Sequence, residues 1–157
     1  MDWGQTMVSL NRRLTEREAN VLEARLVAAK HPSERVTILL GLVREQEKLT
    51  EFNASRSEIH KAFYEVSRKH PDVFEGFGFD TRSWRGPWSE PLEHALAGHW
   101  LFSGKVWFDM LSDQVKLNPG LWPEAESLLA VKYDTRAEED GFRAAAHELA
   151  ALLKPRN

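Results

Sequence analysis

Apolar residues recur every three or four positions in several segments of the chain, which is the spacing of an amphipathic helix. The first stripe consists of Ala19, Leu22, Leu26 and Ala29. Thr15 and Glu18 form a capping-box pattern ahead of it, so we predict a helix over about 15–30. A second stripe follows, made of Val36, Leu39, Leu40 and Val43. Pro32 separates the two stripes, and we predict that it breaks the chain into two helices.

Two further helices are marked by their ends as well as by their apolar faces. Ser55 opens another capping box, and Pro71 prevents the helix that follows from continuing. The predicted buried face of this third helix is Ile59, Ala62, Phe63 and Val66. Ser89 is the N-cap expected for a fourth helix, and Gly104 is its stop signal. The predicted inner face of the fourth helix is Leu92, Ala95, Leu96, His99 and Phe102.

The pattern changes around and after the fourth helix. Residues 75–88 mix glycine and proline with aromatic residues, which predicts an irregular loop or a short extended strand. From Val106 to Leu117, apolar and polar residues alternate on both sides of a Ser-Asp turn, so we predict a β-hairpin. We also predict a short helix over about 123–132 and a last helix over about 135–154. The inner face of the last helix is predicted to be Phe142, Ala145, Leu149 and Leu152.

These elements predict a mostly α-helical fold with one small β-hairpin. The order of helix, helix, glycine-rich link, helix and hairpin is the layout of a winged helix-turn-helix, whose hairpin is the wing and whose preceding helix is the recognition helix. We expect a single domain over 1–157, with a winged-helix core at about 34–118 and flanking helices at about 15–30 and 135–154. A chain of 157 residues is hardly long enough for two full domains.

Composition narrows the cellular setting. The chain has no cysteine, which excludes a disulfide framework and thiolate metal sites. Met1–Leu14 contains no apolar run typical of a signal peptide, and no later run is long enough to span a bilayer. We therefore expect a cytoplasmic protein without a membrane partner.

A short stretch resembles a known family. Gly86-Pro87-Trp88-Ser89, followed by two leucines and then Ser103-Gly104-Lys105-Val106, is similar to a stretch of Panacea-type antitoxin domains and related small bacterial winged-helix proteins. The resemblance covers roughly residues 59–117. It implies a small bacterial protein that works through protein contacts, often beside a toxin or a mobile element. The predicted N-terminal helices lie outside it.

The distribution of charge indicates whether the predicted winged helix binds nucleic acid or protein. A recognition helix that reads DNA normally exposes Arg, Lys, Asn or Gln. The predicted exposed face of the fourth helix is Glu90, Glu93, His94, Ala97 and Leu101. The region 79–118 holds four basic and five acidic residues, and the whole chain has a net charge of -3. A protein partner is therefore favoured over nucleic acid.

Two groups of residues are candidate binding sites. The first combines residue types that dominate protein-binding hot spots: Arg82, Trp84, Arg85 and Trp88. In the alternative interpretation, its tryptophans fill the core and its arginines are merely solvated; Trp100 and Trp107 are expected in the core. The second group is a basic helix face that nucleic acid would contact, although any solvated helix has this pattern. It consists of Arg56, His60, Lys61 and Arg68.

No pattern in the sequence indicates catalysis or metal binding. His94 and His99 are five residues apart, too far round a helix to share a metal, and the pair Glu90 and His94 lacks a third ligand. We expect His99 to be a hydrogen-bonded core histidine. The glycines of residues 76–78 match neither a phosphate loop nor a dinucleotide fingerprint. We expect no enzymatic activity and no cofactor.

The sequence thus favours a non-enzymatic winged-helix protein that binds another protein, as an antitoxin-like or regulatory adaptor. The alternative is a DNA-binding transcriptional regulator that acts as a homodimer joined by its terminal helices.

Overall fold

The structure is a computed structural model that describes residues 15–155. The side chains at position 19 and at positions 21–31 lie outside the described part, and with them the predicted stripe of Ala19, Leu22, Leu26 and Ala29. The chain divides into two compact units, Met1–His31 and Pro32–Asn157. The second unit contains all the side-chain contacts described below, apart from one cap: Thr15 Oγ1 accepts the backbone N–H of Glu18 at the start of the first helix.

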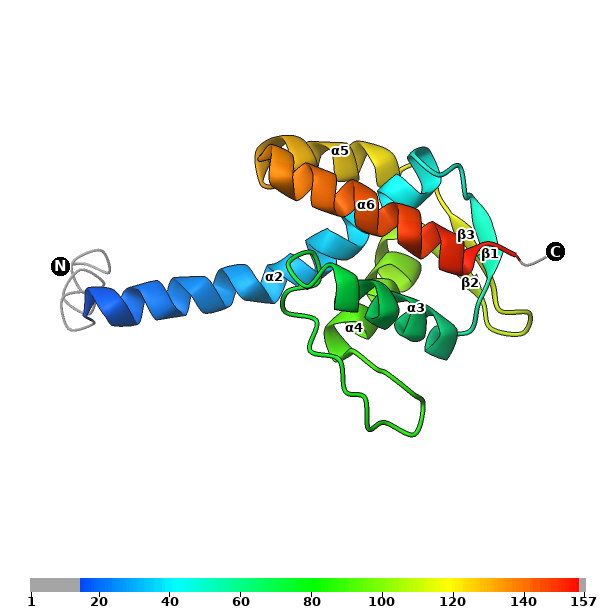
Figure 1. The fold of residues 1–157 in the computed structure, drawn as a ribbon, viewed down its shortest axis with the longest axis horizontal. Coiled ribbons are helices and arrows are strands. Elements are labelled where there is room, and N and C mark those ends of the chain that lie inside the picture. The colour runs from blue at the N-terminus through cyan, green and yellow to red at the C-terminus, as the bar shows by residue number, and fades with distance from the viewer. Residues whose placement is uncertain (1–14, 156–157) are drawn as a thin grey trace. The chain divides into compact units, whose positions relative to one another are not determined.

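The second unit is mostly helical and contains one small antiparallel sheet (Figure 1). The elements described in the chain are α2 (Glu16–Glu45), β1 (Glu51–Asn53), α3 (Arg56–Lys69), α4 (Glu90–Gly98), the π-helix η1 (His99–Ser103), β2 (Val106–Asp109), β3 (Gln114–Leu117), α5 (Leu121–Val131) and α6 (Arg136–Leu153). The mostly helical fold class, the hairpin and the helices predicted from residue 55 onward are confirmed, with ends shifted by a few residues.

The predicted break at Pro32 is wrong, because Pro32 lies inside α2. A proline in a helix removes one backbone hydrogen bond, which normally costs stability. Here the proline is buried, and a Cβ placed on Gly76 would lie 3.4 Å from its Cγ. Residues 36–43 that follow it are all buried. Tertiary packing therefore offsets the local cost of the proline.

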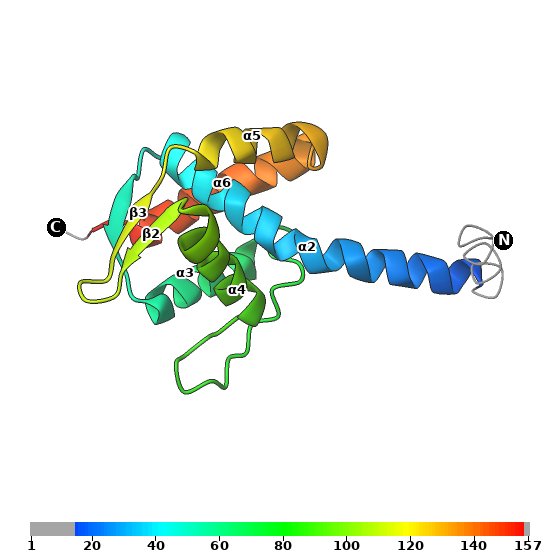
Figure 2. The same ribbon diagram turned by 180° about the vertical axis from the view of Figure 1, so that it is seen from behind.

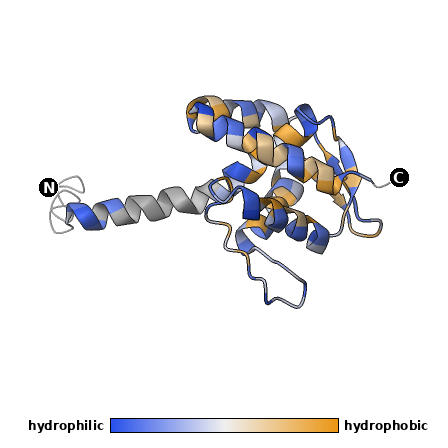
Figure 3. Cartoon of the chain, in the orientation of Figure 1, coloured by the Kyte–Doolittle hydropathy of each residue, from blue (hydrophilic) through white to orange (hydrophobic). Residues whose placement is uncertain are grey.

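The central part of the core is the second half of α2. Its residues Val36, Ile38, Leu39, Leu42 and Val43 have no exposed surface. α3 packs on α6, and Figure 3 shows hydrophobic and hydrophilic bands alternating along both helices, as expected for amphipathic helices. On α6 the predicted inner position Leu152 is wrong: its exposed fraction is 42%, whereas Leu153 is buried.

The sheet has three strands in the order β1-β3-β2. β3 is central, with Val115 opposite Phe52 of β1 and opposite Phe108 of β2. All three of these side chains are buried. Both views show the sheet beside the end of α6 (Figures 1 and 2). β1 was not predicted, because three residues with one inward side chain give too short a pattern to recognise.

The fourth helix begins and ends where its signals predict but changes geometry on the way. Ser89 caps α4 through the backbone N–H of Leu92, and Gly104 adopts a left-handed conformation after η1. The extra residue per turn of the π-helix rotates Phe102 outward, so the prediction that it faces the core is wrong: it is 88% exposed. The remaining predicted inner residues, from Leu92 to His99, are buried.

His99 and the neighbouring tryptophans have different environments. His99 is a hydrogen-bonded core histidine as predicted, with Nε2 2.8 Å from Thr37 Oγ1. Trp100 packs against the core. Trp107 does not, and that prediction is wrong, because it lies on the outer side of β2 with 46% of its surface exposed. The Lys116 ammonium lies over its ring, 5.2 Å from the ring centroid.

Candidate functional site

The residues that precede α4 form a closed loop, which we call the Trp84 loop (residues 80–88). Its two ends form an antiparallel bridge, in which the Asp80 N–H donates to the Trp88 carbonyl at 2.7 Å and the Trp88 N–H donates back at 3.0 Å. The Asp80 carboxylate also accepts the backbone N–H of Arg82. The loop projects away from the helices in both ribbon views (Figures 1 and 2). Its base is thus fixed by backbone hydrogen bonds.

The tip of the Trp84 loop is a hydrogen-bonded turn. The Gly86 N–H donates to the Ser83 carbonyl at 3.0 Å, and the Ser83 hydroxyl accepts the backbone N–H of Arg85. Gly86 has a φ of +87°, which a residue with a side chain rarely adopts. Trp84 stands at the second position of this turn with 91% of its surface exposed. A large apolar ring is therefore held in solvent by an ordered backbone.

Four side chains form a stack that leads from the core to the tip of the loop. The imidazole of His60 is parallel to the indole of Trp88, with ring centroids 3.7 Å apart. The Arg85 guanidinium carbon lies 3.6 Å from the same indole centroid, so it must cover the opposite face. That guanidinium is also 5.6 Å from the Trp84 ring. Cation–π and ring-stacking contacts thus connect the exposed tryptophan to the interior.

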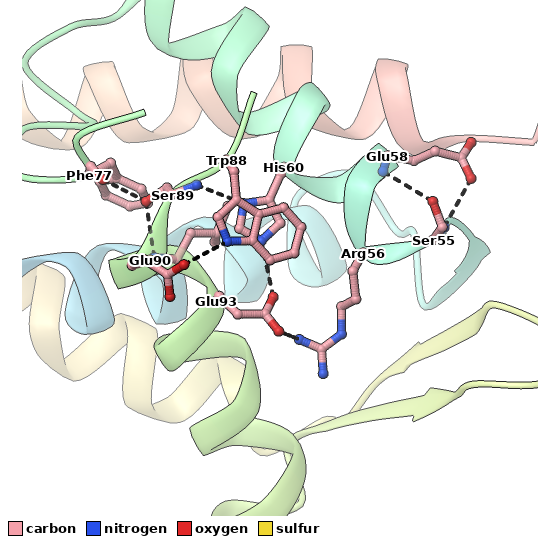
Figure 4. Close-up of polar contacts among 10 residues, drawn as sticks. Ser55, Arg56, Glu58, His60, Phe77, Trp88, Ser89, Glu90 and Glu93 are labelled. Atoms are coloured by element: carbon pink, nitrogen blue, oxygen red, sulfur yellow. Dashed lines mark hydrogen bonds and ion pairs between the residues drawn. The ribbon is translucent and has the colours of Figure 1, made fainter. Parts of the chain in front are cut away.

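The inner end of this stack is a polar cluster, which we call the anchor (Arg56, His60, Trp88, Ser89 and Glu93; Figure 4). His60, Trp88 and Ser89 are buried, and Arg56 and Glu93 are partly buried. His60 has no exposed surface, and its Nδ1 accepts the backbone N–H of Ser89 at 3.0 Å. Nε2 must then bear the proton of the neutral ring, and it donates to Glu93 Oε1 at 3.0 Å. The other carboxylate oxygen of Glu93 accepts Arg56 Nη1 at 2.7 Å.

Two more hydrogen bonds fix the exit of the loop. The Ser89 hydroxyl donates to the Phe77 carbonyl at 2.6 Å and accepts the N–H of Leu92. The Trp88 indole N–H donates to the Glu90 carboxylate at 3.1 Å. The anchor therefore joins the loop to α3, to α4 and to the segment before the loop. Its polar groups are engaged with one another, so this arrangement holds the loop in place.

The anchor makes the stability of the protein depend on pH through Glu93. Burial on its own would raise the pKa of Glu93, but the hydrogen bond from His60 and the charge of Arg56 outweigh it, so the pKa lies below its ordinary value of 4.5. A carboxyl group whose pKa is lowered by folding stabilises the native state above its unfolded pKa. This contribution is lost as the pH falls below 4.5 and through the folded pKa.

Replacement Glu93→Gln should therefore lower the free energy of unfolding at neutral pH, and the difference from the wild type should shrink as the pH falls below 4.5. Urea unfolding between pH 7 and pH 3 measures this. Glu126→Gln, at an exposed glutamate of α5, serves as the control. A constant difference between Glu93→Gln and the wild type across the whole range would contradict the role given to Glu93.

The structure separates the residues of the first predicted site. Arg82 and Trp84 are exposed, Arg85 is half-buried, and Trp88 is only 7% exposed. The core-filling interpretation is thus correct for Trp88 and wrong for Trp84. Trp88 cannot contact a partner directly, but it supports the residues that can. The sequence signal for this difference is weak, since both tryptophans follow small or polar residues in the same loop.

The predicted outer face of the fourth helix, which comprises α4 and η1 in the structure, is exposed only in part. Glu90, His94 and Leu101 are exposed, and Ala97 is half-buried. Glu93 is different, because its carboxylate is turned inward to His60 and Arg56. The prediction that Glu93 faces solvent is therefore wrong. Its spacing from Leu92 and Leu96 places it at the border of the inner face, where a buried partner on another helix can attract it.

The residues of the second predicted site also differ in exposure. His60 does not share an exposed face with the others, because it is fully buried. Arg56 is paired with Glu93, and its guanidinium carbon lies 4.9 Å from the Phe108 ring centroid. Only Lys61 and Arg68 are exposed. His60 follows Ile59 directly, at the edge of the apolar stripe, and sequence periodicity cannot show that Trp88 will cover it.

Among the residues of 15–155 whose side chains the structure describes, no three histidine, aspartate or glutamate side chains lie close enough to hold a metal ion. In the same part of the chain, no helix is both long and apolar enough to cross a membrane. Comparison of the chain with protein-family models, with curated proteins and with solved structures finds no match. The resemblance to Panacea-type antitoxin domains therefore stays a prediction.

Proposed function

We propose that the chain is a non-enzymatic protein-binding module, with an antitoxin-like or regulatory adaptor role, and that it binds its partner through the Trp84 loop. The observation that supports this is the 91% exposure of Trp84 on a loop fixed at its base and at its tip. Tryptophan and arginine are enriched in binding hot spots. A loop that is already ordered loses little entropy on binding, so more of the contact energy appears as affinity.

The order of the elements supports a winged-helix module. α2, β1, α3, α4 and the β2–β3 hairpin follow one another as in winged-helix domains, and β1 pairs with the hairpin from its β3 side. In this arrangement α4 occupies the place of the recognition helix and the hairpin occupies that of the wing. The Trp84 loop is the connection that enters α4, so it lies beside the surface that such domains use for contacts.

Several features of these elements favour a protein partner over DNA. α4 contains no lysine or arginine, and it exposes Glu90. The hairpin tip exposes two apolar residues, Met110 at 69% and Leu111 at 100%. A DNA-reading helix and wing need cations for the phosphates and polar side chains for the bases. Two of the four residues predicted to contact DNA, His60 and Arg56, are engaged in the anchor and are not available to a nucleic acid.

The DNA-binding alternative has its own test. Retardation of mixed-sequence DNA by the protein at low salt, with a steep loss of affinity as salt rises, would favour that alternative.

Replacement Trp84→Ala should remove partner binding and leave the fold intact, because the ring contributes almost nothing to the core. The measurement is quantitative co-purification of proteins with the tagged full chain from the cells that produce it. Loss of a hot-spot residue costs about 2 kcal/mol or more, equivalent to roughly a 30-fold weaker affinity. A specific partner should be retained by the wild type and lost by Trp84→Ala.

The matched control for this experiment is Phe102→Ala, which removes an aromatic ring of similar exposure, 88%, from η1. It should retain the partner. If every co-purifying protein is retained equally by the wild type and by Trp84→Ala, while both have the same thermal unfolding curve, the Trp84 loop is not the binding site.

A further inference from the structure

We infer that the Trp84 loop binds an acidic segment of the partner protein, in which one or two carboxylates lie next to an apolar side chain. This inference rests on the proposed function and specifies the chemistry of the same site. It follows from the charges that the loop leaves without a counterion, from the way in which Arg85 is held, and from the acidic groups that border the loop.

Two arginines of the loop have no ion pair. Within the part of the chain that the structure describes, no carboxylate lies within ion-pair distance of Arg82 or Arg85. Five other arginines are engaged: Arg56, Arg136 and Arg143 pair with glutamate or aspartate, and Arg35 and Arg44 donate to backbone carbonyls. Arg68 on α3 also lacks an ion pair among the described residues, but it has no exposed tryptophan beside it in the sequence. The chain has more acidic than basic residues, 24 against 21. Two unpaired arginines flanking one exposed tryptophan are therefore a local concentration of positive charge in an acidic protein.

Arg85 is held in a way that suits a carboxylate. Its guanidinium is stacked on Trp88, and none of the described residues accepts a hydrogen bond from it. Its Nε is buried without a hydrogen-bond partner. Stacking occupies the face of the guanidinium and burial puts Nε out of a partner's reach, so Nη1 and Nη2 are the in-plane donors left for a two-point contact with a carboxylate. Because the stack already restricts the side chain, little of its freedom is lost when an acceptor arrives.

The neighbouring charges limit the length of the anion. Asp80 lies at one end of the loop and Glu90 lies just beyond the other, and both are exposed. A single-stranded nucleic acid carries a phosphate on every nucleotide, so its next charges would meet these carboxylates. A peptide can place one or two carboxylates at the arginines and neutral residues elsewhere. The charge distribution therefore favours an acidic peptide segment over a polyanion.

Trp84 adds an apolar contact to the positive charge of the two arginines. Its ring is exposed beside the Arg85 guanidinium, so an apolar or proline side chain can pack on it while a neighbouring carboxylate reaches the arginines. Burial of this ring reduces the access of water to the arginines and strengthens their contact with the carboxylate. The site should thus select a short sequence of mixed character rather than negative charge alone.

A random peptide library displayed on phage tests the inference. The full chain is the immobilised target, and we expect the selected peptides to be enriched in aspartate and glutamate next to an aromatic, proline or aliphatic residue. A synthetic peptide of the selected sequence is then compared with its Asp→Asn and Glu→Gln version. We expect the neutral peptide to bind at least about tenfold more weakly.

Three variants of the protein locate the contact. Arg82→Gln and Arg85→Lys should both weaken binding of the acidic peptide; Arg85→Lys retains the charge but loses the planar two-point geometry. Arg68→Gln, at an exposed arginine of α3, is the matched control and should bind as the wild type does. Thermal unfolding of each variant shows that it is folded under the conditions of the binding experiment.

The outcomes separate this inference from the proposed function. Peptides that require Trp84 but show no enrichment in acidic residues would overturn the acidic partner and leave the binding loop in place. Peptides that bind Trp84→Ala as well as the wild type, or a library that yields no peptide dependent on Trp84, would overturn both. Tighter binding of oligothymidylate than of the acidic peptide, lost in Arg82→Gln, would replace the inference with single-stranded nucleic acid.

Discussion

Replacement of His60 by alanine should lower the free energy of unfolding by about 3–5 kcal/mol, because it removes a buried ring and both of its hydrogen bonds. The cavity would lie against Trp88, whose indole stacks on the imidazole at 3.7 Å. The Ser89 N–H would lose its acceptor, and Glu93 would lose one of its two donors. A loss of this size is a large share of the stability of an ordinary domain. Urea unfolding followed by circular dichroism measures it.

Two further variants show which part of the His60 environment matters. His60→Phe retains a ring that can stack on Trp88 but makes no hydrogen bonds, so its stability should lie between those of the wild type and His60→Ala. His94→Ala changes the same residue type at an exposed position of α4 and should alter stability by less than about 0.5 kcal/mol. If His60→Ala were as stable as His94→Ala, the anchor would not hold the loop.

Replacement of Gly41 by leucine should destabilise the protein by about 3 kcal/mol, at the upper end of the usual cost of overpacking a core. Gly41 lies where α2 crosses α5, and even a Cβ at this position would lie 2.6 Å from Ala125 Cβ and 3.2 Å from the Leu121 carbonyl oxygen. The carbonyl belongs to the backbone and cannot rotate away. A longer side chain therefore forces the two helices apart. Thermal and urea unfolding of Gly41→Leu measure this cost.

Gly98 provides the matched control, because a side chain added there should stabilise the protein instead of destabilising it. It lies at the end of α4 with helical backbone angles, and a Cβ there would meet nothing within 4 Å. Gly98→Ala should stabilise the protein by about 0.5–1 kcal/mol, because alanine loses less backbone freedom on forming a helix. Stabilisation by Gly41→Leu, or a large loss in Gly98→Ala, would show that the packing of these helices differs from that described.

The elements that sequence reasoning predicted correctly have local signals. Ser55 and Ser89 cap their helices through their own hydroxyls, and Gly104 adopts the left-handed conformation that ends a helix. Such features need only a few neighbouring residues. The continuity of α2 through Pro32 has no local signal, because it depends on the burial of the residues that follow. The same holds for β1, whose partner strand is more than sixty residues away in the sequence.

The candidate site was predicted as a set of residue types but not as an arrangement. Arginine and tryptophan between residues 82 and 88 drew attention to this loop, but the sequence could not separate exposed Trp84 from buried Trp88. The difference arises because the turn at Ser83–Gly86 directs one indole outward, while His60 from α3 covers the other. Equally, nothing near Glu93 in the sequence indicates that Arg56 and His60 will hold its carboxylate.

The bridge between Asp80 and Trp88 brings the two ends of residues 81–87 next to each other. No residue of the anchor lies within residues 81–87, and none of these residues is buried in the core. Surface loops with closely spaced ends tolerate substitution and insertion better than core elements do. The protein could therefore acquire a new binding specificity by exchange of one short segment, and the same seven positions offer a place to graft foreign recognition sequences onto this scaffold.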